Sequence, residues 1–196
     1  MYAAVTLKSR QRRMKDFYNL EDSKYVLIGR TSPWSNEMIP PIPTGEETAL
    51  TELIGGKLVV DQWYVKMLTD PTEEEKEAGV YYKGHYYYRT TILDDAISNG
   101  CDAVMVHVDL DRDELPLQTF RQVGLQTQVQ HSAETITASQ FESLTNKGQL
   151  EIIENRKPQT REEDQMESIY ILVSFWYSYI LSLFKWTRKR KDIKKI

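Results

Sequence analysis

The chain has 196 residues, of which 40% are hydrophobic and 28% are charged, and its formal net charge is −4. This composition allows one sizeable hydrophobic core, so folding requires neither a metal ion nor a disulfide. Residues 185–196 hold seven Lys or Arg and one Asp, a balance of +6, which leaves −10 for residues 1–184. Such an acidic body lacks the basic face that duplex nucleic acid requires. No nucleic-acid partner is therefore expected, and any such contact would belong to the basic tail.

The first thirty residues predict a strand, a short helix and a second strand. Residues 2–7 are typical of a strand, and Ser9 is expected to cap a helix that ends near Asn19. Residues 24–30 form a compact run that favours a strand, with Arg30 at its end.

A proline-rich segment, residues 31–44, follows this strand. Its four prolines fix φ and remove backbone donors, which excludes a helix or a central strand and predicts a stiff, extended loop. Trp34 follows Pro33 in this loop, and it either plugs the core or serves as an anchor for a partner, because tryptophan is enriched in both settings. Arg30, Pro33 and Trp34 are accordingly candidate interface residues.

The next segment contains a glycine pair. Residues 46–54 predict a short helix that Gly55 and Gly56 would end, and residues 58–68 predict a strand. The pair lacks the spaced glycines and the Lys-Ser/Thr of a phosphate-binding loop. Residues 70–79 are Glu-rich and predict an exposed turn or one helical turn.

Residues 80–92 carry the densest group of aromatic side chains. The pattern predicts a hairpin that turns at Lys83 and Gly84. Tyrosines on both faces could bury area on one side and leave hydroxyl-bearing rings on the other. The hairpin is either purely structural or a binding surface for a protein partner, a glycan or a second copy. Its candidate interface residues are Tyr81, Tyr82, Tyr86 and Tyr88.

No segment carries a recognisable catalytic or metal-binding motif. The acidic run that begins at Asp109 lacks the glycine and the glutamate of a calcium loop, because Glu114 and Phe120 occupy those positions. The single cysteine, Cys101, is best interpreted as a small buried hydrophobic residue. No HExxH, GxSxG or CxxC element is present. We therefore expect a protein that is not an enzyme and that has no cofactor, no metal ligand and no catalytic residue.

The remaining segments are mostly strands. Residues 103–110, 120–130, 150–154 and 168–175 predict strands, residues 137–144 a helical turn or two, and residues 155–167 a charged loop. The expected fold is mainly β, of the α+β type: a β-sandwich with short helices at its edges.

Several short motifs occur in an order that resembles a known family. They are Phe17-Tyr18-Asn19, Gly29-Arg30, Pro33-Trp34-Ser35 and Pro40-Pro41-x-Pro43, then Phe120-Arg121-Gln122, Glu154-Asn155-Arg156 and the strand at residues 169–175. In this order they resemble the baseplate wedge subunit of contractile-tailed bacteriophages. The resemblance covers about the first seventy and the last sixty residues of the globular part.

The resemblance implies a homodimeric structural subunit with a β-sandwich core that contacts other baseplate wedge proteins. Such a protein would be assembled in the host cytoplasm and would reside in the virion. Residues 1–175 would form a single wedge domain, in which residues 69–119 are too few to hold the second domain that better-known members insert there. Residues 176–196 extend beyond the family pattern as a hydrophobic and then basic tail.

This tail leaves two alternatives. Residues 168–184 are uncharged and precede a basic flank, which is the layout of a short membrane anchor. If residues 169–175 form a core strand, the remaining nine are too few to cross a bilayer, and an amphipathic docking segment fits better. The tail adds Trp176, Tyr179, Phe184 and Trp186 to the interface candidates. A tail-anchored membrane protein with an acidic partner-binding domain is the main alternative function, and a glycan-binding module is another.

Overall fold

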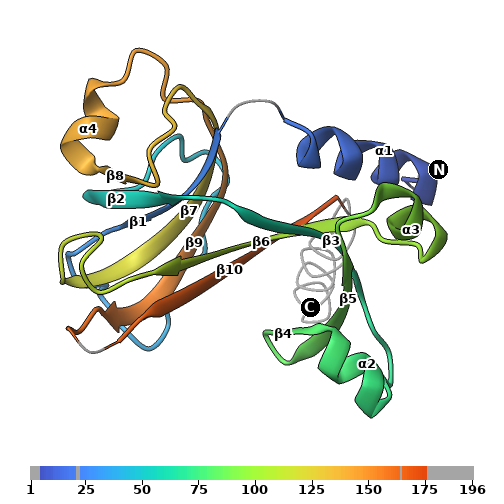
Figure 1. Cartoon of the computed structure of the whole chain (residues 1–196). Coiled ribbons are helices and arrows are strands. Elements are labelled where there is room, and N and C mark those ends of the chain that lie inside the picture. Colours follow the sequence, from blue (N-terminus) through green and yellow to red (C-terminus); the bar gives the residue numbers. More distant parts are fainter. Residues whose placement is uncertain (1–4, 21–22, 164, 176–196) are drawn as a thin grey trace, which may run out of the picture.

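The protein forms two five-stranded antiparallel sheets in the computed structural model, which describes residues 5–20, 23–163 and 165–175 (Figure 1). The strands of sheet A are, in spatial order, β8 (Thr135–Thr137), β2 (Leu53–Leu58), β1 (Ser23–Gly29), β7 (Thr119–Val129) and β9 (Gln149–Thr160). Those of sheet B are β10 (Glu167–Ser174), β6 (Ala103–Leu110), β3 (Asp61–Met67), β5 (His85–Thr90) and β4 (Val80–Tyr82).

Within the described residues, four short helices lie at the margins of the sheets: α1 (Leu7–Tyr18), α2 (Glu73–Ala78), α3 (Leu93–Ser98) and α4 (Ala138–Ser143). Thr6 caps α1, because its side chain accepts a hydrogen bond from the amide of Ser9. Both α2 and α4 begin with a capping box. Helix α1 packs on β6 and β3, whereas α2 packs on β5 and β4 (Figure 1).

The main core lies between the two sheets. Alternate residues of β6 and β10 point inward and meet β1 and β7 of sheet A, because successive side chains of a strand point to opposite faces. The aliphatic side chains that these four strands bury there are Val26, Ile28, Val104, Val106, Val108, Leu110, Val123, Leu125, Ile169, Ile171 and Val173. Burying each one contributes about 1.5–3 kcal/mol before the entropy cost of folding. The mainly β sandwich with short edge helices is therefore confirmed.

Most of the elements expected from the sequence are present. The strands predicted at residues 24–30, 103–110, 120–130 and 168–175 correspond to β1, β6, β7 and β10. The hairpin turns at Lys83 and Gly84, both of which have positive φ. Residues 31–44 contain neither helix nor strand, as the four prolines predict.

Four local predictions are wrong. Ser9 does not cap the first helix but lies inside α1, whose cap is Thr6. Leu7 begins a helix instead of ending a strand, and residues 2–4 of that predicted strand lie outside the described residues. No helix forms at residues 46–54. Gly55 and Gly56 do not end a helix but lie inside β2, where the neighbouring strands pass so close that a side chain would not fit. An added Cβ at Gly55 would lie 2.5 Å from the carbonyl oxygen of Ile136. Residues 155–160, expected in a charged loop, instead continue β9.

Candidate functional site

The proline-rich loop, defined as residues 31–44, is tied down at its base by one carboxylate. Glu52 accepts hydrogen bonds from the amide of Thr31 at 2.8 Å and the amide of Ser32 at 2.7 Å, and from both hydroxyls. These bonds stabilise the ionised carboxylate and hold the pKa of Glu52 at about 2, with the largest effect from the Ser32 hydroxyl. Arg30 and Glu52 flank the base with positive φ values of 55° and 48°. The base is therefore a strained but highly bonded junction.

A second tie joins the middle of the loop to β7. The guanidinium of Arg121, only 8% exposed, donates to the carboxylate of Glu37 at 2.9 Å and to the carbonyl oxygen of Thr31. A charge-assisted, nearly buried pair of this kind fixes both position and orientation. The loop therefore cannot slide along the sheet without breaking this pair.

A third set of contacts attaches the loop to the edge strand β9. The indole Nε1 of Trp34 donates to the carbonyl oxygen of Arg156 at 2.9 Å, and the Asn155 amide donates to the Pro41 carbonyl oxygen at 2.9 Å. Trp34 is 9% exposed, and the Arg30 guanidinium lies 3.9 Å from the centroid of its ring. The ring thus plugs the loop onto the body and leaves little surface for a partner. Pro33, beside it, is exposed.

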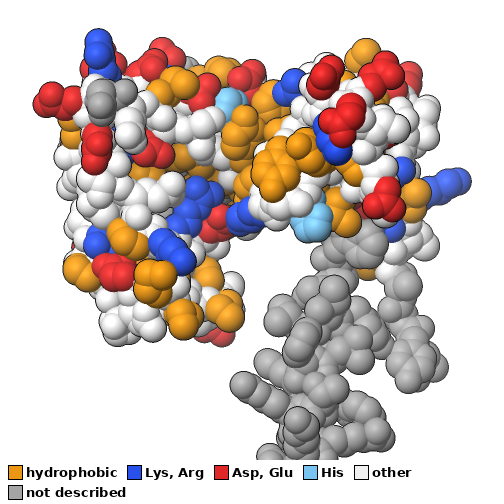
Figure 2. Space-filling view, turned by 90° about the horizontal axis from the view of Figure 1, so that it is seen from below, with side chains coloured by type: hydrophobic (Ala, Val, Ile, Leu, Met, Phe, Trp, Pro, Cys, Tyr) orange, Lys and Arg blue, Asp and Glu red, His pale blue; other side chains and the backbone are white. Residues whose placement is uncertain are grey.

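The exposed side of the loop carries three large apolar side chains. Met38 is 68% exposed, Ile39 is 72% exposed and Ile42 is 91% exposed. We call these three residues the apolar tip. Figure 2 shows hydrophobic side chains on the surface of the lobe that carries this loop. Burying the three against a partner would contribute about 5 kcal/mol, and the stiff loop would lose little entropy in doing so.

Sequence reasoning favoured Trp34 and missed the apolar tip, although a signal was present. Ile42 stands between Pro41 and Pro43. A side chain in such a run belongs to no helix or central strand, so the usual route into a core is closed to it. An aliphatic residue between two prolines is thus a reason to expect an exposed apolar group.

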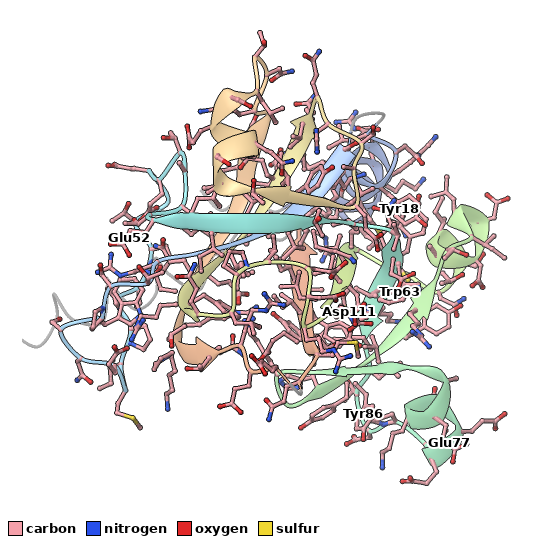
Figure 3. All side chains as sticks on the ribbon, turned by 60° about the vertical axis from the view of Figure 1, so that its left-hand side comes forward. Tyr18, Glu52, Trp63, Glu77, Tyr86 and Asp111 are labelled. Atoms are coloured by element: carbon pink, nitrogen blue, oxygen red, sulfur yellow. The ribbon has the colours of Figure 1, made fainter. Side chains whose placement is uncertain are left out.

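The tyrosine hairpin has both structural and exposed side chains. Tyr88 donates its hydroxyl to Asp95, which raises the pKa of Tyr88 to about 12. Tyr82 donates to Glu154 of β9 at 3.3 Å. Tyr81 is 60% exposed, and its ring packs on that of Tyr86 with centroids 4.9 Å apart. The hairpin brings the four candidate tyrosines into one region, and Figure 3 shows its Tyr86 well away from Glu52 at the base of the loop.

The four candidates in the tail, Trp176, Tyr179, Phe184 and Trp186, lie outside the described residues. In the ranges that the structure describes, no helix is long and apolar enough to span a membrane. Those same ranges hold no group of three or more His, Cys, Asp or Glu side chains arranged for a metal ion. Cys101 is fully buried, and this burial raises the pKa of its thiol to about 11.

Comparison with known proteins identifies the family. The family described as "Baseplate wedge 3 tail fiber network component" matches residues 2–175. The chain belongs to this family of phage baseplate components. It is also 34% identical to Virion protein 3 of Enterococcus phage phiEF24C over 167 residues, which are 84% of each chain. The family match confirms the resemblance found in the sequence, and the matched range ends directly after β10.

Proposed function

We propose that this baseplate component is a structural wedge subunit that docks onto neighbouring wedge proteins of a contractile tail through the apolar tip. The main support for this proposal is that Met38, Ile39 and Ile42 are exposed to solvent. The loop that presents them is held in place by Glu52, Arg121 and Trp34. A rigid apolar tip is suited to a stable protein–protein contact and not to catalytic turnover, so in this proposal the subunit has a structural role without catalysis.

The proposal has an assembly context. Residues 1–175 act as one wedge domain, the subunit works as a homodimer, and it is incorporated into the baseplate in the host cytoplasm. The resemblance to the wedge subunit supports these statements. Sedimentation equilibrium of the full chain tests the homodimer, because a monomer at micromolar concentration would contradict it.

Charge placed on the apolar tip tests the docking. Ile42→Asp removes an apolar contact worth about 1.5–3 kcal/mol and introduces a carboxylate that would be buried without a partner. Co-assembly with the other wedge proteins of the same phage should therefore weaken at least tenfold. Far-UV circular dichroism should remain unchanged, because Ile42 is 91% exposed.

Ile92→Asp is the matched control. Ile92 is 63% exposed and directly precedes α3, on the side of the molecule away from the loop (Figure 1). This variant should assemble like the wild type. If Ile42→Asp co-assembles as well as the wild type, the proposal is wrong. If Ile42→Asp and Ile92→Asp lose co-assembly to the same extent, assembly responds to surface charge in general and not to the apolar tip.

A further inference from the structure

The side of sheet B that faces away from the main core carries a second apolar cluster. By strand register, Leu172 of β10 pairs with Met105 of β6, which pairs with Trp63 of β3, so these side chains share one face. Val65 and Met105 are fully buried there, whereas Trp63 and Leu172 remain partly exposed. We call this face the aromatic face; its members include Trp63, Val65, Tyr82, Tyr87, Met105, Tyr170 and Leu172.

Polar contacts bound the aromatic face along the edge next to β9. The Tyr82 hydroxyl and the Lys83 ammonium both donate to Glu154 of β9, and Arg156 donates to the Tyr170 carbonyl oxygen. Burial alone would raise the pKa of Glu154, but Arg156 and Lys83 beside it hold that pKa below its usual value. These bonds hold the hairpin tip against β9. Figure 2 shows hydrophobic side chains gathered between the two lobes of this underside.

The chain that follows β10 starts at the edge of this face. β10 itself contributes Tyr170 and Leu172, and the described residues end at Phe175. Residues 176–184 contain no charge, and seven of the nine are aromatic or aliphatic. Crossing the other four strands of sheet B requires about 19 Å, and nine extended residues span about 30 Å. The segment is thus long enough and apolar enough to cover the face.

Charge complementarity favours the same path. Helix α2, packed on β5 and β4 at the far edge of sheet B, carries Glu73, Glu74, Glu75 and Glu77, and its one lysine, Lys76, pairs with Glu73. Residues 185–191 hold five Lys or Arg and no acid. Figure 3 shows Glu77 near Tyr86, with Trp63 above them on the same side of the molecule. A tail that crosses the face would bring its basic part to this acidic helix.

We propose that residues 176–184 dock onto the aromatic face of their own chain and that residues 185–191 contact α2. The docking covers the apolar side chains that sheet B leaves partly exposed, and it makes the tail a third layer of the subunit. This inference does not depend on the proposed function, since it concerns contacts within one chain.

Disulfide trapping in the full-length chain tests the docking. Met67 is 50% exposed on β3, in register with Tyr87 of the same cluster, so Met67→Cys combined with Leu181→Cys places one thiol on the face and one in the tail. The control pair replaces Met67→Cys by Ile97→Cys, a 46% exposed position on α3. The native Cys101 does not compete, because it is fully buried.

An intrachain disulfide should form at least tenfold faster in the Met67 pair than in the control pair. Equal rates would overturn the docking, and covalent dimers on a non-reducing gel would show that a second copy supplies the tail. Adding Glu74→Lys and Glu77→Lys to the Met67 pair should slow trapping severalfold. An unchanged rate in that variant would overturn the contact with α2.

Discussion

Replacing Trp34 by alanine should lower the free energy of unfolding by about 3 kcal/mol. Replacing a buried tryptophan by alanine lowers the free energy of unfolding by about 3–5 kcal/mol. The lower value applies here because the ring lies near the protein surface and not in the main core. The ring is 9% exposed, and its Nε1 donates to the Arg156 carbonyl oxygen. About 1 kcal/mol of the loss belongs to this hydrogen bond.

Trp34→Phe separates the two contributions. Phenylalanine retains most of the packing but has no N–H to donate, so the expected loss is about 1 kcal/mol. Urea unfolding followed by far-UV circular dichroism measures both variants, and a constant slope with denaturant shows that the same surface is exposed. The alanine variant should also melt about 6–12 °C lower than the wild type.

The reasoning fails if the free energy of unfolding of Trp34→Ala lies within about 0.5 kcal/mol of the wild-type value, because substitutions at exposed sites commonly change stability by that much. Such a result would mean that the loop detaches independently of the sandwich. If co-assembly with wedge proteins were lost at the same time, Trp34 would be a partner anchor instead of a plug.

Acidification and glycine substitution give two further predictions. Because Glu52 has a folded pKa of about 2 against an ordinary 4.5, its contribution to stability is full above about pH 4.5 and is lost as the pH falls through 2. The Thr31 amide resonance should therefore titrate near pH 2, and Glu52→Gln should abolish this titration. Gly55→Ala should cost about 1–3 kcal/mol because its Cβ would meet the Ile136 backbone. Gly124→Ala should cost less in the same urea assay, because its closest contact is a flexible leucine side-chain end.

The strands of the main core were predictable because their signal is local. Residues 103–110 are a nearly continuous run of aliphatic residues, and in residues 120–130 apolar and polar residues alternate. Both segments form buried strands. The proline-rich loop was equally predictable, since each proline acts on its own backbone. These predictions needed no knowledge of what lies next to the segment.

Two of the errors occurred where a distant strand decides the local structure. Gly55 and Gly56 suit a helix end as well as a strand, and only the close passage of β1 and β8 selects the strand. Residues 155–160 are polar and include Pro158, which is typical of a loop. They form a strand because β7 supplies hydrogen bonds on one side and β9 is the sheet edge, where a proline is tolerated.

The sequence by itself determined the family, the mainly β class and the stiff loop, because these follow from short motifs, residue periodicity and proline geometry. Only the tertiary structure decided which side chains of that loop are available to a partner. Trp34 is covered because β9 and Arg30 lie against it. Met38, Ile39 and Ile42 are exposed because Glu52 and Arg121 fix the loop on the sheet with these three side chains in solvent. Exposure depends on neighbours distant in the chain, so the prolines around Ile42 give a reason to expect an exposed side chain but do not assign which residues of the loop are covered.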